Sequence, residues 1–301
     1  MTTLSHRGRP GHPDHPRLTP HPPDPAAVAA HRLAPFLGLA ALVSAAGSLF
    51  FPDLLSGAPV TVGNLRGTAL VVLVVGVPML AAGAARARRG SVRGLVVWLG
   101  ATAYLTYQGV MFCFGTPINA LFLPYVALLA LGVWSLAALV TATAAAPVLA
   151  APGPRTPWRP LAGLLATFAV LNGLAWIARA APVTWTGDRP DALAGSGLLT
   201  SPVWVQDLAF WVPAAVVVAV LTWRHSPRGA VLAGGMLAFY VVECLSVASD
   251  QWWGVRADDD HPAVASMSAV PGGVVLALLT AAALAWLLSH VDGVSPRRVD
   301  D

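Results

Sequence analysis

Glu243 is the strongest candidate for chemistry, because it is the only glutamate in the chain and lies inside the apolar segment 229–249. It follows an arginine turn by roughly 15 residues, or about 22 Å along a helix. That depth is within the hydrocarbon of a membrane, where ionisable side chains are costly and are often functional. Such a carboxylate could exchange a proton. It could equally be a hydrogen-bonded packing residue between helices.

Gln108 takes the place of Glu243 when residues 73–108 are aligned without a gap on residues 208–243, and Tyr107 lies beside it. If the two segments have the same structure, Gln108 and Glu243 lie at the same depth and can flank one cavity. The alternative is ordinary hydrogen bonding, because amides commonly join helices in membrane bundles.

Asp207 lies in the first turns of the apolar segment 203–222, where the positive end of a helix favours an acid. The same alignment, extended by one position, pairs it with Val72, so this acid belongs to one copy only. Structural and functional interpretations of Asp207 are equally supported. Asp250, which follows Glu243 on nearly the same helix face, is predicted to be solvated at the outer end of its helix.

Asn119 and Tyr125 are polar residues near the start of the fourth apolar segment, next to Pro117 and Pro124. Pro117 suits a first helical turn, whereas Pro124 is expected to kink the helix. Kinked helices can line cavities, so Asn119 and Tyr125 are candidate polar groups there. The alternative is a bent helix without a site.

Metal and cofactor chemistry have little support. The acidic run 258–261 carries cation-binding side chains, but its spacing is not that of a calcium loop, and such runs are usually solvated. The His-rich residues 1–33 are predicted to be a disordered, solvated tail. Cys113 and Cys244 form no metal-binding pattern, and no P-loop, dinucleotide-binding glycine pattern, HExxH or nucleophile elbow occurs. We therefore predict no metal and no cofactor.

Long apolar helices must position these residues. Only 11% of the chain is charged, against about 25% in soluble domains. Most apolar segments are near the roughly 20 residues that a helix needs to cross about 30 Å of hydrocarbon. Backbone groups in lipid must be satisfied within the segment, so helices are predicted and not strands. The sequence predicts an all-α membrane protein with eight transmembrane helices, at about 35–51, 68–85, 94–113, 118–145, 160–181, 203–222, 229–249 and 266–289.

An internal duplication is also predicted. The aligned segments 73–108 and 208–243 have a constant offset of 135, and both contain a Val-Pro pair and an Arg-x-Ser-x-Arg-Gly turn. Four helices per repeat is an even number, so both halves insert with the same orientation, as parallel repeats about an axis along the membrane normal. The predicted organisation is a tail at 1–33, repeats at 34–159 and 160–289, and a second tail at 290–301.

The distribution of arginines predicts the orientation. All 18 basic residues are arginine, and fourteen of them fall on the inner side when the N-terminus is placed in the cytoplasm. Eight crossings return the C-terminus to the same side. The arginines are scattered in short loops, which indicates membrane orientation and not nucleic-acid binding.

The stretches 114–128 (FGTPINALFLPYVAL) and 202–213 (PVWVQDLAFWVP) carry a resemblance. They are similar to uncharacterised multi-pass integral membrane proteins of high-GC Gram-positive (actinobacterial) bacteria. The resemblance implies an eight-helix protein of the bacterial plasma membrane and names no activity.

Three functions remain compatible with these predictions. The repeat and the intramembrane acid favour a transporter or permease for a small solute, coupled to protons through Glu243. A non-catalytic scaffold or complex subunit is the alternative, because helices rich in small residues pack tightly. A lipid-acting membrane enzyme is less favoured, since several acids or histidines would have to converge at one interface. Membrane lipids, and a small-molecule substrate in the first case, are the expected partners.

Overall fold

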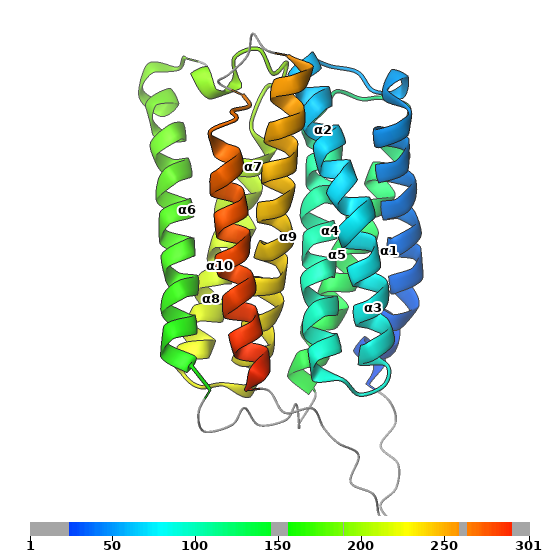
Figure 1. Ribbon diagram of the computed structural model, residues 1–301, viewed down its shortest axis with the longest axis vertical. Coiled ribbons are helices and arrows are strands. Elements are labelled where there is room, and N and C mark those ends of the chain that lie inside the picture. The colour runs from blue at the N-terminus through cyan, green and yellow to red at the C-terminus, as the bar shows by residue number, and fades with distance from the viewer. Residues whose placement is uncertain (1–23, 146–155, 189, 259–263, 291–301) are drawn as a thin grey trace, which may run out of the picture.

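The protein is a bundle of long helices that run along a common axis, as the computed structural model in Figure 1 shows. The structure describes residues 24–145, 156–188, 190–258 and 264–290. Within these ranges it contains helices and turns and no strand. Eight helical spans in the same ranges are long and apolar enough to cross a membrane. The prediction of an all-α protein with eight apolar spans is therefore confirmed.

Most spans are single helices, and two are interrupted by a π-helical turn. The single helices are α1 (Pro25–Phe50), α4 (Val92–Phe114), α5 (Phe122–Ala145), α6 (Trp158–Thr186), α9 (Pro227–Ala257) and α10 (Ala269–Ser289). One interrupted span consists of α2 (Pro59–Val71), η2 (Val72–Gly76) and α3 (Val77–Ala87). The other consists of α7 (Pro202–Gln206), η4 (Asp207–Trp211) and α8 (Val212–Trp223). Short 3-10 turns, η1 (Pro52–Leu54) and η3 (Asp191–Leu193), lie between spans.

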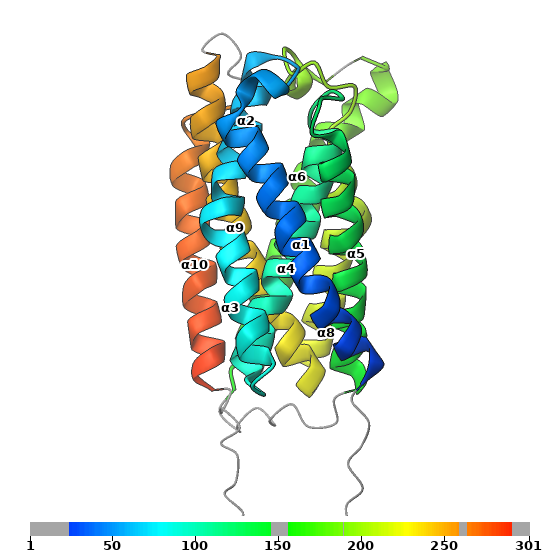
Figure 2. The same ribbon diagram turned by 90° about the vertical axis from the view of Figure 1, so that its right-hand side faces the viewer.

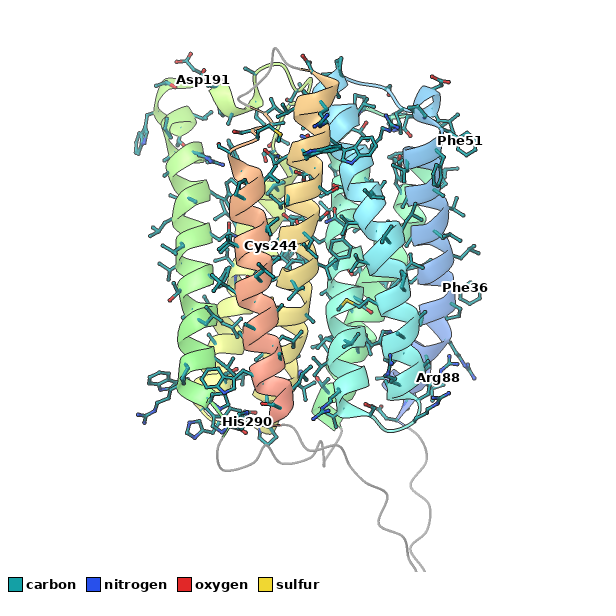
Figure 3. All side chains as sticks on the ribbon, viewed as in Figure 1. Phe36, Phe51, Arg88, Asp191, Cys244 and His290 are labelled. Atoms are coloured by element: carbon teal, nitrogen blue, oxygen red, sulfur yellow. The ribbon has the colours of Figure 1, made fainter. Side chains whose placement is uncertain are left out.

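The two central helices are α4 and α9, which are the most buried spans and pack against each other. α2 and α10 cover α9, α3 and α5 cover α4, and α1 lies along α5. Figure 2 shows α1 crossing the face of the bundle next to α5. Figure 3 places Arg88 and His290 at one end of the bundle, and Phe51 and Asp191 at the other. We call these the arginine end and the opposite end.

α1 begins at Pro25, earlier than the predicted start at residue 35. The Asp24 carboxylate caps this helix by accepting a hydrogen bond from the Ala26 N–H at 3.0 Å. Proline fits the first turn, because its missing N–H is not needed there, and the alanines that follow are the strongest helix formers. The tail predicted at 1–33 is therefore helical from residue 25, while residues 1–23 lie outside the described ranges.

Two prolines in the middle of a span follow widened helical turns. Pro78 comes after the π segment Val72–Gly76, and Pro213 comes after Asp207–Trp211. In a regular helix a proline ring collides with the carbonyl four residues earlier and leaves it without a donor. A π-turn moves that carbonyl and changes its partner, which lets the helix continue past the proline. The two π segments have the same offset along the chain as the aligned Val-Pro pairs.

The two turns at the arginine end share a backbone conformation. Gly90 and His225 both have positive φ, 79° and 57°. The serine after each of them, Ser91 or Ser226, accepts a hydrogen bond from the N–H three residues later. A left-handed residue thus ends one helix and a serine cap begins the next, which explains why both copies keep the arginine-serine pattern.

Glycines meet where α4 and α9 cross. A Cβ at Gly100 would lie 2.9 Å from the Gly235 carbonyl oxygen and 2.5 Å from the Ala238 Cβ. A Cβ at Gly235 would lie 2.5 Å from the Leu99 Cδ2. Only a residue without a side chain allows the two backbones to approach so closely. Gly100 and Gly235 are also matched by the internal alignment.

Other helix ends also differ from the predicted spans. α5 begins at Phe122 and not at 118, because the Asn119 Oδ1 accepts a hydrogen bond from the N–H two residues later, at 2.9 Å, and stabilises the preceding turn. Pro124 then lies in the first turn of α5, where proline is tolerated and does not kink the helix. The stretch 250–257, beyond the predicted span 229–249, is the last part of α9.

Candidate functional site

The centre of the bundle contains a polar contact between α4 and α9. The Gln108 Nε2 donates a hydrogen bond to the Glu243 Oε2 at 2.7 Å. Gln108 is only 2% exposed, whereas Glu243 is half-buried. Cys244, the next residue, lies near mid-height of the bundle in Figure 3. The residues that the sequence alignment matched are therefore in direct contact, far from either end.

The same two helices make a second polar contact. The Tyr104 hydroxyl donates a hydrogen bond to the Ser246 Oγ at 3.2 Å, and both side chains are buried. Tyr104 precedes Gln108 by one helical turn, and Ser246 follows Glu243 by almost one turn, so each pair lies on one helix face. The polar part of the α4–α9 interface therefore extends over more than one turn.

Asp207 forms a second acidic centre at the start of the π segment η4, with its side chain 6% exposed. Its Oδ2 accepts hydrogen bonds from the Trp176 Nε1 at 2.7 Å and the Asn172 Nδ2 at 3.0 Å, both from α6. Tyr107 of α4 lies near the same carboxylate. Asp207 thus links α6 to the interrupted span.

The two acidic centres form one electrostatic unit. Asp207 and Glu243 lie close enough for their charges to interact. In the described part of the chain, every hydrogen-bond donor to the two carboxylates is a neutral side chain. Acids within a membrane usually pair with each other or with a counter-charge. We call this unit the acid cluster; its members are Asp207, Glu243, Asn172, Trp176, Tyr107 and Gln108.

Aromatic rings lie against the acid cluster. Trp211 of η4 stacks on Phe239 of α9 with ring centroids 4.6 Å apart, and the Tyr107 ring lies 5.7 Å from each. Phe168 of α6 stacks on Tyr240 of α9 at 5.2 Å. Phe168 and Tyr240 lie about one helical turn from the acid-cluster residues of their own helices, on the side of the arginine end. The acidic groups are therefore bordered by aromatic surface on that side.

Three positions that the internal alignment pairs with acid-cluster residues are apolar, whereas the position paired with Glu243 is Gln108. Leu37, Ala41 and Val72 stand where Asn172, Trp176 and Asp207 stand in the second copy. All three are 0% exposed. Val72 begins η2 as Asp207 begins η4, so a π-interrupted span forms without an acid at that position.

The structure brings together four of the six sequence candidates, Glu243, Gln108, Tyr107 and Asp207. Asn119 and Tyr125 lie elsewhere. Asn119 bonds within its own turn, and the Tyr125 hydroxyl pairs with the Ser48 Oγ of α1 at 2.7 Å. The reason is that α5 packs mainly on α1 and α4 and makes little contact with α9. Asn119 and Tyr125 therefore do not adjoin Glu243, whose partner is Gln108.

Asp250 also differs from its prediction. It is half-buried and not fully solvated, and its Oδ1 accepts a hydrogen bond from the Gln251 Nε2 at 3.1 Å. Gly67 of α2 lies against its backbone, where a Cβ would be 2.6 Å from the Asp250 Cα. The glycine lets α2 approach and cover this part of α9.

Sequence reasoning did not select Asn172, Trp176 or Ser246. Asn172 and Trp176 are four residues apart and therefore lie on one face of α6, which is the only sign that the chain offers. Their role as donors depends on α6 lying beside η4, and no local pattern reveals that. Ser246 is a common interhelical residue without a distinguishing neighbour.

The described ranges contain no group of three or more His, Cys, Asp or Glu residues that could hold a metal ion. Residues 259–261 of the acidic run lie outside those ranges, as does the second tail beyond residue 290. No family model matches the chain, and neither the curated proteins nor the solved structures include a match. The functional argument therefore depends on the site and its chemistry.

Proposed function

We propose that this protein is a transporter for a small solute in the bacterial plasma membrane, and that Glu243 exchanges a proton during transport. The observation that carries the proposal is the acid cluster, in which two carboxylates lie among neutral donors within the eight-span bundle. An acid at the centre of a membrane helix costs about 2.5–3.5 kcal/mol on insertion scales. Two such residues in one cluster favour a functional role.

The difference between the aligned segments supports function over packing. Leu37, Ala41 and Val72 fill the first copy with apolar side chains that are completely buried. Because η2 forms with Val72 at the position aligned with Asp207, the acid is not needed to form a π-interrupted span. The polar set is therefore better explained by something that it binds.

The two carboxylates are suited to different roles. Asp207 is held by two donors from α6, which fix its orientation. Glu243 has one donor, Gln108, and keeps accessible surface, so a proton or a solute can reach it. The other ionisable groups near Glu243 are Asp207 on η4, Tyr104 and Tyr107 on α4, and Cys244 and Asp250 on α9, all of them acids. Glu243 is the carboxylate that we assign to proton exchange.

We also infer that the aligned segments belong to two parallel four-helix repeats, 34–159 and 160–289, related by an axis between α4 and α9. Three local features recur at the same spacing and support this inference: the π segments, the left-handed residue of the arginine turn, and the glycine at the crossing. Repeats of this kind allow the two halves of a transporter to move against each other around a central site.

The orientation that we propose has both termini in the cytoplasm. It is supported by the excess of arginines at one end of the bundle, where α1 begins and α10 ends (Figure 1). The resemblance to membrane proteins of high-GC Gram-positive bacteria supports the assignment to a bacterial plasma membrane.

Proton-coupled uptake tests the proposal. The full chain is reconstituted into liposomes that contain the pH-sensitive dye pyranine, and amines, amino acids, carboxylic acids and sugars are added outside in turn. We expect at least one class to change the internal pH. Glu243→Gln keeps the shape of the side chain and removes the exchangeable proton, so this variant should insert normally and lose the response. Asp191→Asn, which alters an exposed acid in a connecting turn, is the matched control.

Two results would contradict this function. One is an internal pH that responds to no solute in the wild-type protein although the protein is folded. The other is an equal response in Glu243→Gln. Either result would favour a non-catalytic scaffold, in which the acid cluster only joins helices.

A further inference from the structure

We propose that the acid cluster binds an amphiphilic organic cation, with a protonated amine or quaternary ammonium head, which enters from the lipid between α6 and α10. This assigns a substrate class to the proposed transporter and therefore rests on the proposed function. The inference combines the packing of α6, the accessible surface of the cluster, its uncompensated charge and its aromatic border.

The helices on the two sides of the bundle pack differently. On one side α1 lies along α5 and closes the bundle. On the other side α6 packs on α8, touches η4 and α9, and makes hardly any contact with α10, the counterpart of α5. Figure 1 shows α6 at the edge of the bundle and α10 beside α9. Both helices carry exposed apolar side chains such as Leu174 and Leu278, which suit surfaces that face lipid tails.

Residues of the acid cluster on the α6 side of the bundle keep accessible surface near the middle of their spans. Asn172 and Trp176 of α6 and Glu243 of α9 are each half-buried. The residues aligned with the first two, Leu37 and Ala41, are 0% exposed. Because α1 covers α5 on that side and α6 leaves α10 uncovered on this side, the exposed parts of the cluster are reached between α6 and α10.

The charge of the cluster selects the head group. Asp207 and Glu243 receive hydrogen bonds only from neutral side chains in the described part of the chain. A cation bound between them would supply the counter-charge that buried acids need. The stacked rings of Phe168 and Tyr240 offer the aromatic surface that organic cations prefer. An anionic ligand would meet two carboxylates, and the guanidinium of Arg179 lies beyond the Trp176 ring, one turn nearer the opposite end.

The other routes to the cluster are less suited to a cation. The exposed Arg179 lies one turn nearer the opposite end, with its guanidinium carbon 5.0 Å from the centre of the Trp176 ring, and repels a positive ligand that approaches along α6. Toward the arginine end, the Phe168–Tyr240 stack and the Gly100–Gly235 contact fill the space between helices. The lateral opening remains, and it favours a ligand that partitions into the membrane.

Three probes with the same phenyl ring test the head group: phenethylammonium, phenethyl alcohol and 3-phenylpropanoate. Binding to the full chain in lipid nanodiscs is measured by isothermal titration calorimetry. We expect the cation to bind at least about tenfold more tightly than the alcohol, and the anion to bind least. Asp207→Asn and Glu243→Gln should each weaken cation binding about tenfold or more, because each removes one counter-charge. Asp191→Asn should leave it unchanged.

A substitution that only perturbs the fold would weaken every probe, so a second variant separates the two causes. Phe168→Leu keeps an apolar side chain and removes the aromatic face. It should weaken phenethylammonium several-fold and leave phenethyl alcohol within about twofold. Tetramethylammonium, which has the charge and no apolar part, should bind at least about tenfold more weakly than phenethylammonium, because it does not partition into lipid.

Equal binding of the cation and the anion, or unchanged cation binding in both acid variants, would overturn the proposal. Tetramethylammonium that binds as tightly as phenethylammonium would show that the ligand needs no phenyl ring, and would overturn the amphiphilic class. If phenethylammonium fails to bind while another solute changes the internal pH through Glu243, the substrate class is wrong and transport stands. If phenethylammonium binds and no solute moves protons, the site is correct and the transport function is wrong.

Discussion

Gln108 and Glu243 are 135 residues apart in the chain, and the Gln108 amide donates a 2.7 Å hydrogen bond to the Glu243 carboxylate. A second pair has the same separation, since the Thr61 hydroxyl donates a 2.7 Å hydrogen bond to the Ser196 carbonyl oxygen. Matched residues of two copies can touch only near the axis that relates the copies. Both contacts are thus what a twofold axis along the α4–α9 interface would produce.

The axis leads to a geometric prediction. In an experimental structure, α2–α4 should superpose on α7–α9 by a rotation of about 180° around the membrane normal, as in parallel repeats. Pro78 should coincide with Pro213. A best fit that needs an axis in the membrane plane, or a register other than the one that pairs these two prolines, would show that the sequence similarity arose by chance.

The Gln108–Glu243 contact predicts a non-additive effect on stability. Gln108→Leu or Glu243→Leu removes one partner and leaves the other unpaired in the bundle, which should lower the free energy of unfolding by about 1–2 kcal/mol each. The double variant should lose less than the sum, because neither group then remains unsatisfied. Denaturant titration in detergent micelles measures all three variants. Glu243→Gln, which keeps a hydrogen-bonding side chain, should stay within about 0.5 kcal/mol of the wild type.

Strict additivity in that cycle would mean that the two side chains do not stabilise each other. A large loss in Glu243→Gln would indicate that the charge itself holds the helices together. The first result would leave the polar contact without energetic meaning, and the second would weaken the assignment of proton exchange to this residue.

Hydropathy and the internal sequence alignment were enough to find the eight spans and the Gln108–Glu243 pair, because both depend on the chain alone. They were not enough for Asn172 and Trp176, whose importance comes from the packing of α6 on η4. Tyr125 shows the opposite case. It is a polar residue that the sequence suggested for the site, but its hydroxyl bonds to Ser48 of a different helix. Side-chain partners across helices depend on which helices are adjacent, and composition does not encode that locally.

The accuracy of the predicted helix ends had a different physical limit. Pro124 signals a kink only if the helix has already begun, and the side-chain bond of Asn119 delays that start to Phe122. Likewise, Asp24 begins α1 within a stretch whose polar composition indicated a tail. In both cases one capping hydrogen bond decides the boundary, whereas hydropathy averages over many residues.

The orientation can be tested with alkaline phosphatase, which folds only outside the cytoplasm. A fusion after Gly90, in a turn at the arginine end, should be inactive, and a fusion after Asp191, at the opposite end, should be active (Figure 3). Immunoblots check that the two fusions accumulate equally. Activity after Gly90 would reverse the proposed topology.

Gly90 predicts a backbone effect in the same turn. Its φ is 79° and a Cβ there would meet nothing within 4 Å, so Gly90→Ala tests conformation without a steric clash. The left-handed conformation should cost an alanine about 1 kcal/mol of stability. The matched change is His225→Gly, which removes a side chain from a φ of 57°. This change should raise the free energy of unfolding, but by less than about 1 kcal/mol, because the ring contact of His225 with Trp158 is lost.

The crossing of α4 and α9 makes the sharpest steric prediction. Gly100→Ala would bring a methyl group within 2.9 Å of the Gly235 carbonyl oxygen, and backbone cannot move aside as a flexible side chain can. The two central helices must separate, which should destabilise the protein by about 1–3 kcal/mol. Gly163→Ala in α6, where a Cβ would meet nothing within 4 Å, is the control and should be neutral or slightly stabilising. Thermal unfolding of both variants in detergent gives the comparison. Equal midpoints would mean that α4 and α9 are not in close contact, and would remove the support for an axis between them.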